Sequence, residues 1–346
     1  MEIINPNKFA KISDVIFSEV ISEEEFLIKN SANELIVLSS SIVDSDKFIW
    51  YVSKQIVIKE NDIIFCQTEL VTELFKLLKK ENRFSNLTLI THQSDKAITR
   101  KLFLEKPDSI KRWFGTNVKY RNQLVSSIPI GVNNNYMKNY PIEIDFKHSK
   151  NLHFKDKKDS VYLNFNINTR FLQRFHLKYK FMNIQNFNVD ENNLTKEQYL
   201  DELNNHKYVA CPWGNGLDTH RLWETLYSNS LPILKNHLAF RQFDDLPILF
   251  VSSFRSLDYK NLEPSSYDVN LSNTSADFQY WKNLILTQNS EVTEKSLIKL
   301  NLKINEKQVL KSFFRRRKMK QRYKKFKYFI FRLYKLTVRL LIYRKV

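Results

Sequence analysis

The stretch from Tyr208 to Lys235 concentrates side chains that could bind and position an anion. An apolar run is followed by a loop with two of the chain's four glycines, Gly214 and Gly216, then by a helical pattern and a second apolar run. This order predicts a strand, a tight loop, a helix and a strand. The polar groups that follow the glycines are Asp218, His220, Arg221 and Glu224. Because the first amides of a helix lack partners and its dipole is positive there, we expect an anion site suited to a diphosphate.

Each of these side chains also has a purely structural interpretation. The planar guanidinium of Arg221 suits bidentate contact with phosphate, but its spacing equally suits a salt bridge to Asp218 or Glu224. Asp218 stands where a helix cap is expected as much as a catalytic group. His220 could contact a sugar or a phosphate, or satisfy nearby backbone groups. Trp223 is expected in the core, since an aromatic side chain on the inner face of a helix more often packs than stacks on a ligand.

This stretch resembles the signature of exostosin-like glycosyltransferases, a family that includes bacterial enzymes that build surface polysaccharides. The residues that match the signature are Pro212, Gly214, Asn215, Gly216, Asp218, His220, Arg221, Trp223, Glu224, Leu226, Pro232 and Ile233. Three further segments resemble the same family, namely residues 91–95 (THQSD), 113–118 (WFGTNV) and 128–131 (IPIG). The glycine that usually precedes the Pro-Ile strand is replaced here by Asn229 and Ser230. Asparagine tolerates the left-handed conformation, so the turn can survive.

The resemblance implies a B-type glycosyltransferase of the α/β class, in which two doubly wound parallel-sheet (Rossmann-like) domains face each other across a cleft. It implies transfer of a hexose or pentose, with inversion, from a nucleotide-diphosphate sugar such as a UDP-sugar. The acceptor would be a hydroxyl of a lipid-linked bacterial surface glycan such as lipopolysaccharide or capsule. Arg221 would hold the diphosphate and Glu224 the ribose hydroxyls. The expected donor-binding set is Arg174, Gly214, Asn215, Gly216, Asp218, His220, Arg221 and Glu224. With the diphosphate charge met by Arg221 and the helix dipole, neither a metal nor another cofactor is expected.

The catalytic base is expected on the other half of the chain. An inverting sugar transfer needs a group that takes the proton of the acceptor hydroxyl. His92 and Asp95 follow a predicted strand, and catalytic groups collect at such strand ends in α/β folds, so these two residues are the candidates. Trp113 and Asn117 could shape the acceptor side, although Trp113 could equally fill the core.

Two arginines at the start of a predicted helix extend the expected anion site. Arg170 and Arg174 could reach the same diphosphate from this helix, with Thr169 as its cap. A solvated helix face would explain both side chains as well.

Alternating strand and helix patterns lie on both sides of a polar, Lys-rich stretch, residues 145–159, which is expected to be a linker. The expected domains are an acceptor-side domain (1–150), a nucleotide-sugar-binding domain (159–305) and a basic tail (306–346). The predicted strands are 34–39, 62–65, 87–91, 124–130, 161–166, 209–211, 231–234 and 248–251. The predicted helices are 69–80 and 170–180, with a short helix leading into a loop over 111–117 and a capping box from Thr195 to Gln198.

Several alternative classes are disfavoured by the sequence. Cys66 and Cys211 lie in apolar runs and are expected to be buried, reduced thiols rather than a disulfide or a zinc site. The N-terminus lacks a basic segment before an apolar core, and no window approaches the roughly 20 apolar residues of a membrane-spanning helix. Asp44 and Asp46 form a DxD sequence that could hold Mg²⁺ or Mn²⁺, but they precede any complete nucleotide-binding unit, so a surface loop is expected.

The C-terminal tail carries most of the charge. The formal net charge of the chain is +18, and residues 311–345 contain fifteen Lys and Arg and no acidic residue. The apolar residues that recur every three or four positions are Phe326, Phe329, Ile330, Leu333, Leu336, Leu340 and Tyr343. This pattern predicts a basic amphipathic helix that lies on an anionic membrane surface. The resemblance to bacterial enzymes implies that this surface is the cytoplasmic face of the inner membrane. One alternative is a non-enzymatic protein that uses this tail to bind a membrane or nucleic acid. Another is a terminal helix packed on the body.

Overall fold

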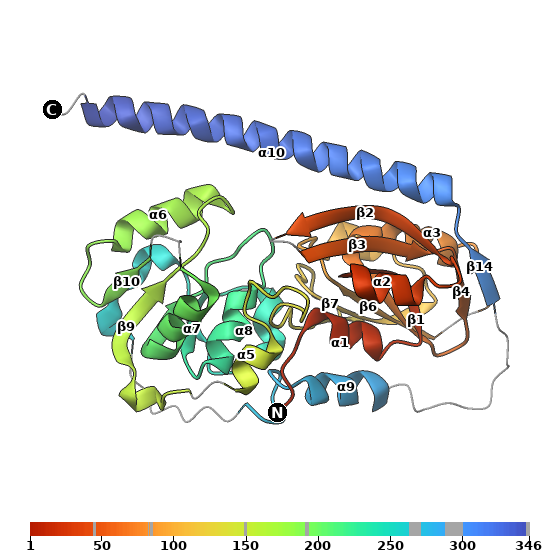
Figure 1. Ribbon diagram of the computed structural model, residues 1–346, viewed down its shortest axis with the longest axis horizontal. Coiled ribbons are helices and arrows are strands. Elements are labelled where there is room, and N and C mark those ends of the chain that lie inside the picture. The colour runs from red at the N-terminus through yellow and green to blue at the C-terminus, as the bar shows by residue number, and fades with distance from the viewer. Residues whose placement is uncertain are drawn as a thin grey trace. The chain divides into compact units, whose positions relative to one another are not determined.

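Figure 1 shows the computed structural model of the chain, whose described residues are 1–43, 46–81, 83, 86–148, 151–190, 194–262, 271–287 and 300–343. Residues Met1–Lys303 form one compact unit that contains both large sheets, and the chain from Ile304 onward forms a second unit. The class is α/β, as predicted.

The first sheet has seven strands in the order β2-β3-β1-β5-β6-β7-β8. Its strands are β1 (Val15–Ser22), β2 (Leu35–Val43), β3 (Asp46–Ser53), β5 (Ile63–Gln67), β6 (Leu87–His92), β7 (Ile110–Gly115) and β8 (Val125–Ser127). Strands β1, β5, β6, β7 and β8 are parallel, whereas β2 and β3 pair antiparallel at one edge. Every residue of β5 and β6 is buried, as expected for inner parallel strands covered on both faces. The sheet is therefore mixed, and the prediction of a wholly parallel sheet was wrong for this edge.

The second sheet has five strands, all parallel, in the order β10-β9-β11-β12-β13. Its strands are β9 (Lys158–Leu163), β10 (Phe187–Val189), β11 (His206–Ala210), β12 (Leu231–Lys235) and β13 (Leu249–Val251). The chain passes from β9 to β10 on one side and then returns to place β11 on the other side of β9. Ligands in sheets of this kind bind outside the carboxyl ends of the strands at such a reversal, so the loops after β9 and β11 are where a ligand site is expected.

The remaining elements of the first unit surround or flank these sheets (Figure 1). Its helices are α1 (Pro6–Lys11), α2 (Glu23–Lys29), α3 (Val71–Leu78), α4 (Arg100–Leu104), α5 (Glu143–Lys147), α6 (Phe171–Phe181), α7 (Lys196–Asn205), α8 (His220–Tyr227) and α9 (Phe278–Thr287). Short 3₁₀ turns lie at Thr68–Leu70, Phe154–Asp156, Leu238–Phe243, Phe254–Ser256 and Tyr259–Asn261. Strands β4 (Gln55–Ile58) and β14 (Leu300–Lys303) form a separate antiparallel pair.

Several local predictions can be compared with the structure. Thr195 and Gln198 form the expected capping box at the start of α7. Residues 110–115 form strand β7 rather than a short helix, because their apolar residues pair between β6 and β8. The expected linker contains the end of α5 and a 3₁₀ turn. The N-cap of α6 is Arg170, in a left-handed conformation, and not Thr169.

The N-terminal segment fixes the loop after β8. Val132 N donates to Ile4 O at 2.9 Å, and Ile4 N donates to the hydroxyl of Tyr227 in α8 at 3.1 Å. Gly131 has a φ of +71°, and a Cβ at this position would lie 2.3 Å from Ile4 O. Glycine is needed here on both grounds, and the loop is held beside the N-terminus of α8.

The second unit contains one long helix, α10 (Glu306–Tyr343). The sequence had predicted a helix in this tail. No helix within the described residues combines the length and the apolar character needed to cross a membrane.

Candidate functional site

The glycine loop follows β11 directly and is anchored by an asparagine from the first sheet. Asn117 lies just after β7 in a left-handed conformation, and its Oδ1 accepts hydrogen bonds from Leu217 N at 2.6 Å and Asp218 N at 3.1 Å. A Cβ on Gly216 would lie 2.8 Å from that oxygen, so glycine is required for the approach. These two amides are therefore already satisfied by the protein. The donors left for an anion belong to the residues that follow.

Arg221 supplies the clearest free donors. Its Nε donates to the Tyr199 hydroxyl at 3.2 Å, and its guanidinium carbon lies 5.5 Å from the centroid of the Tyr199 ring. Tyr199 in turn donates to Glu224 Oε2 at 2.7 Å. Among the described residues, Arg221 makes no ion pair, and its two terminal nitrogens have no partner. The alternative of a direct salt bridge to Asp218 or Glu224 is thus not what the structure has. The Tyr199 hydroxyl lies between Arg221 and Glu224, so the two terminal nitrogens of Arg221 remain available to a ligand.

Glu224 is held in a buried position between two halves of the molecule. Its carboxylate accepts from Tyr199 of α7 and, at 3.5 Å, from Asn133 Nδ2 in the loop after β8. Burial raises the pKa of Glu224, while the nearby charge of Arg221 opposes this shift.

Further cations cluster around Trp213, which lies in the approach to the glycine loop. The guanidinium carbon of Arg170 lies 4.9 Å and the Lys235 ammonium 5.3 Å from its ring centroid. Burial, and then the charges of Arg221 and Arg170, lower the pKa of Arg174 to about 10. Within the described part of the chain, Arg170, Arg174, Arg221 and Lys235 form no salt bridge with a carboxylate. These four cations without a paired carboxylate at the chain reversal make this region the candidate site for an anion.

Arg174 has a different role from the one the sequence suggested. Its Nε donates to Trp213 O at 3.1 Å, its Nη2 to Pro212 O at 2.9 Å and its Nη1 to Asn166 O and the Thr169 hydroxyl at 3.0 and 2.6 Å. Most of its donors are therefore spent on backbone carbonyls of the loops after β9 and β11. Arg174 therefore holds the glycine loop in shape and adds positive charge to the site. One N–H of its Nη2 has no acceptor among these contacts and could donate to a ligand.

Asp218 and His220 join the glycine loop to the loop after β8. Asp218 accepts from Ile130 N at 2.7 Å and from Trp223 Nε1 at 2.9 Å, and burial raises its pKa to about 7. The N-cap of α8 is Thr219, so Asp218 is not the helix cap considered above. His220 Nδ1 lies 2.7 Å from Gly131 O. A carbonyl oxygen only accepts, so Nδ1 carries the hydrogen and the neutral ring keeps a lone pair on Nε2.

The interpretation of His92 as a general base requires correction. The ring is fully buried, its Nε2 lies 3.0 Å from Pro129 O and its Nδ1 accepts from Gln93 N at 2.7 Å. Both ring nitrogens are thus occupied, and the ring stacks on Phe9 at 5.3 Å. Burial lowers the pKa of His92 to about 4. With neither a free lone pair nor access to solvent, His92 holds the end of β6 in place.

The other expected residues of the first half fall into two groups. Asp95 is exposed and has no partner among the described residues, so it remains a candidate base. Trp113 is buried, and its Nε1 donates to the Thr91 hydroxyl at 2.8 Å, which makes it a core residue. Asp44 and Ser45 lie outside the described residues, as does the side chain of Asp46.

Sequence reasoning missed Tyr199, Asn133, Trp213 and Lys235 as parts of this site. Trp213 and Lys235 lie inside the stretch that drew attention, at the ends of the two apolar runs, so their positions after β11 and in β12 could have signalled them. Tyr199 and Asn133 come from α7 and the loop after β8, and no local pattern marks them.

Comparison of the chain with models of protein families gives no match, and a comparison with curated proteins finds none that is similar.

Proposed function

We propose that this protein is a glycosyltransferase that transfers a sugar from a nucleotide-diphosphate donor to a hydroxyl of a glycan, without a metal ion. The observation that carries the proposal is the group of four cations, Arg170, Arg174, Arg221 and Lys235, that have no carboxylate ion pair among the described residues and lie at the chain reversal of a parallel sheet. A diphosphate leaving group gains negative charge as its bond to the sugar breaks. Fixed cations in a partly buried site stabilise that charge.

The proposed roles of Arg221 and Glu224 are those that the resemblance to exostosin-like glycosyltransferases implies. The free fork of Arg221 contacts the diphosphate, and Glu224 accepts from the ribose hydroxyls. The acceptor oxygen forms a bond to the anomeric carbon of the sugar while the bond from that carbon to the phosphate oxygen breaks, and the electron pair leaves with the nucleoside diphosphate. The proton of the acceptor hydroxyl passes to a base.

His220 is the base that the geometry favours. Its Nδ1–H is fixed by Gly131 O, which orients the ring and leaves Nε2 to accept a proton. His220 begins α8 and precedes Arg221 directly, so the base and the anion contact are positioned by the same turn of helix. Asp95 is the second candidate.

The test of the proposed function is a binding screen with UDP, GDP, CMP and dTDP in buffer that contains EDTA. We expect one nucleoside diphosphate to raise the melting temperature and to bind with micromolar to millimolar affinity, because binding to the folded state stabilises it. Calorimetry on the best nucleotide gives the affinity. No binding of any of the four would contradict the proposal, and binding that appears only after Mg²⁺ or Mn²⁺ is added would contradict the metal-independent form and draw attention to Asp44 and Asp46.

The C-terminal helix is proposed to bring the enzyme to a lipid-linked acceptor such as a lipopolysaccharide or capsule precursor, on the cytoplasmic face of the inner membrane. Its sequence combines fifteen cations between residues 311 and 345 with apolar residues at helical spacing. On the described part of α10, the exposed apolar residues are Phe314, Met319, Tyr323 and Phe326. Nucleic-acid-binding tails are usually polar, so we favour a membrane surface over nucleic acid as the partner.

Removing residues 312–346 should abolish sedimentation with anionic liposomes and leave nucleotide affinity unchanged. Each Lys or Arg near an anionic surface contributes about 1 kcal/mol, and the buried apolar residues contribute more. Every residue of the candidate site lies in the unit Met1–Lys303, so donor binding should persist. The measurements are liposome sedimentation and calorimetry with the nucleotide.

High salt should release the intact protein from liposomes only partly, because salt does not screen the apolar contacts. Neutral liposomes serve as the control for the charge contribution. Full release at moderate salt together with tight binding of RNA or DNA would reassign the tail to nucleic acid. Unfolding of the truncated protein would instead make the tail a structural helix.

A further inference from the structure

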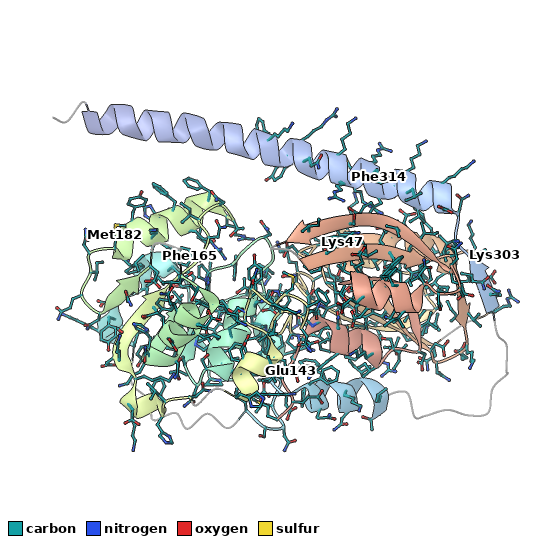
Figure 2. The ribbon with its side chains drawn as sticks, viewed as in Figure 1. Lys47, Glu143, Phe165, Met182, Lys303 and Phe314 are labelled. Carbon is teal, nitrogen blue, oxygen red and sulfur yellow. The ribbon has the colours of Figure 1, made fainter. Side chains whose placement is uncertain are left out.

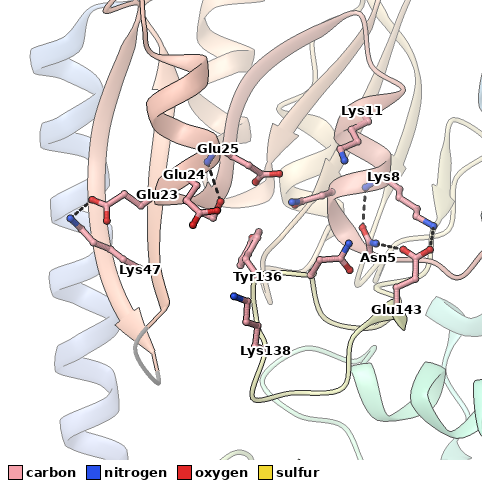
Figure 3. Close-up of a pocket in the computed structure, with 13 residues that line it drawn as sticks. Asn5, Lys8, Lys11, Glu23, Glu24, Glu25, Lys47, Tyr136, Lys138 and Glu143 are labelled. Carbon is pink, nitrogen blue, oxygen red and sulfur yellow. Dashed lines mark hydrogen bonds and ion pairs between the residues drawn. The ribbon is translucent and has the colours of Figure 1, made fainter. Parts of the chain in front are cut away.

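A cavity of about 640 Å³ lies at the end of β1, and none of the four cations of the candidate site lines it. Figure 3 shows walls that come from α1, from Glu23 to Glu25 at the start of α2, from Lys47 of β3 and from the loop between Tyr136 and Glu143. Ser22 and Asn135 also line the cavity. Its volume falls within the range of small-molecule sites, which is roughly 300–1,000 Å³. The elements around it belong to the first unit, and their side chains are visible in Figure 2.

The lining is polar and balanced in charge. It contains four lysines and four glutamates, together with asparagines and Tyr136. Two of the carboxylates are neutralised by lysines, since Glu23 pairs with Lys47 and Glu143 pairs with Lys8 at 3.0 Å. Glu24, Glu25 and Lys11 make no ion pair with any residue that the structure describes. The cavity therefore offers hydrogen-bond acceptors and donors that the protein itself does not use.

The aromatic wall of the cavity is rigidly held. Tyr136 donates from its hydroxyl to Val20 O at 3.0 Å and accepts from Asn134 Nδ2 at 2.9 Å. Its ring packs on Phe48 with the centroids 5.2 Å apart. A wall fixed in this way loses little freedom when a ligand binds.

One loop connects this cavity with the candidate catalytic site. The loop begins after β8, where Ile130 N donates to Asp218 and Gly131 O accepts from His220. It then provides Asn135 and Tyr136 to the cavity wall. A ligand in the cavity would thus touch the same short segment that orients the proposed base.

We propose that this cavity binds a neutral saccharide unit of the acceptor glycan, at a distance from the hydroxyl that receives the sugar. The proposal rests on the proposed function. A sugar ring carries many hydroxyls that each donate and accept, which suits a wall of carboxylates, amides and ammonium groups. The balance of four lysines against four glutamates gives no net field to select an anion or a cation, and the polar lining disfavours an apolar ligand.

The experiment uses the full-length protein on a microarray of neutral and acidic glycans, followed by calorimetry with the best neutral glycan. We expect neutral glycans to bind, and we expect Asn135→Trp, which fills the cavity from an exposed position, to abolish this binding. Glu24→Gln should weaken it about tenfold through loss of a charge-assisted hydrogen bond. Glu34→Gln, an equally exposed carboxylate outside the cavity, is the matched control and should have no effect.

The outcome is separable from that of the proposed function, because nucleotide binding is measured independently. Arg221→Ala should weaken nucleotide binding and keep glycan binding, whereas Asn135→Trp should keep nucleotide binding and lose glycan binding. Unchanged glycan binding by Asn135→Trp would overturn the assignment of the cavity. So would a preference for acidic glycans, or the absence of any glycan binding by the intact protein.

Discussion

Arg221→Ala should weaken nucleotide binding by about 10- to 100-fold, which corresponds to the roughly 1.5–3 kcal/mol of a charge-assisted hydrogen bond. The variant loses the two terminal guanidinium nitrogens, which have no partner among the described residues, and it leaves Tyr199 hydrogen-bonded to Glu224. The fold should therefore persist, with a nearly unchanged melting temperature. Calorimetry with the nucleotide chosen by the screen, and thermal unfolding without it, check the two statements.

Arg241→Ala is the matched control, because Arg241 is exposed and has no partner within the described residues. It should retain wild-type affinity. A second variant, Arg221→Lys, keeps the charge but loses the planar fork, so we expect an intermediate affinity. If Arg221→Ala unfolds yet binds normally when folded, the arginine is structural and the anion site lies elsewhere.

His220→Asn should lower the rate of sugar transfer by about 100- to 10,000-fold, the usual contribution of a general base. The asparagine amide can still donate to Gly131 O, so the loop after β8 should keep its position, but an amide is far too weak a base to take the proton. Nucleotide affinity should change little. The rate is measured as nucleoside diphosphate released from the donor sugar in the presence of acceptor.

The competing candidate is tested in the same assay. Asp95→Asn should reduce the rate only slightly, and His153→Asn, at an exposed histidine, should leave it unchanged. A large loss for Asp95→Asn together with an active His220→Asn would transfer the role of base to Asp95.

The sequence predicted the parts of the fold whose patterns are local. The glycine loop between β11 and α8, the apolar strand β12 and the capping box at Thr195 could be read from residue spacing, because each depends on neighbours in the chain. Strand β7 could not be predicted in this way, because its apolar residues form a strand only through pairing with β6 and β8. At the antiparallel edge of the first sheet, β2 and β3 form a local hairpin, but its position beside β1 depends on pairing between more distant residues.

In the candidate site as well, the sequence predicted local features but not the contacts between distant segments. The sequence drew attention to Arg221 and Glu224, but it suggested a direct salt bridge as one alternative, and the hydroxyl of Tyr199 stands between them instead. His92 looked like a base because a histidine after a strand is a common catalytic position. Its contact with Phe9 and its hydrogen bond to Pro129 O involve segments far away in the sequence, and only the bond from Gln93 N is local.

The hydrogen bonds from the glycine loop to Asn117 bear on how this protein could be recombined with others. Leu217 and Asp218 of one half depend on an amide oxygen of the other half, and Gly216 is shaped to it. A chimera cut between the two sheets, at about residue 150, would separate these hydrogen-bond partners. An exchange of the glycine loop therefore has to carry Asn117 and the loop after β8 with it, so the exchangeable module is discontinuous in the gene and does not coincide with either sheet.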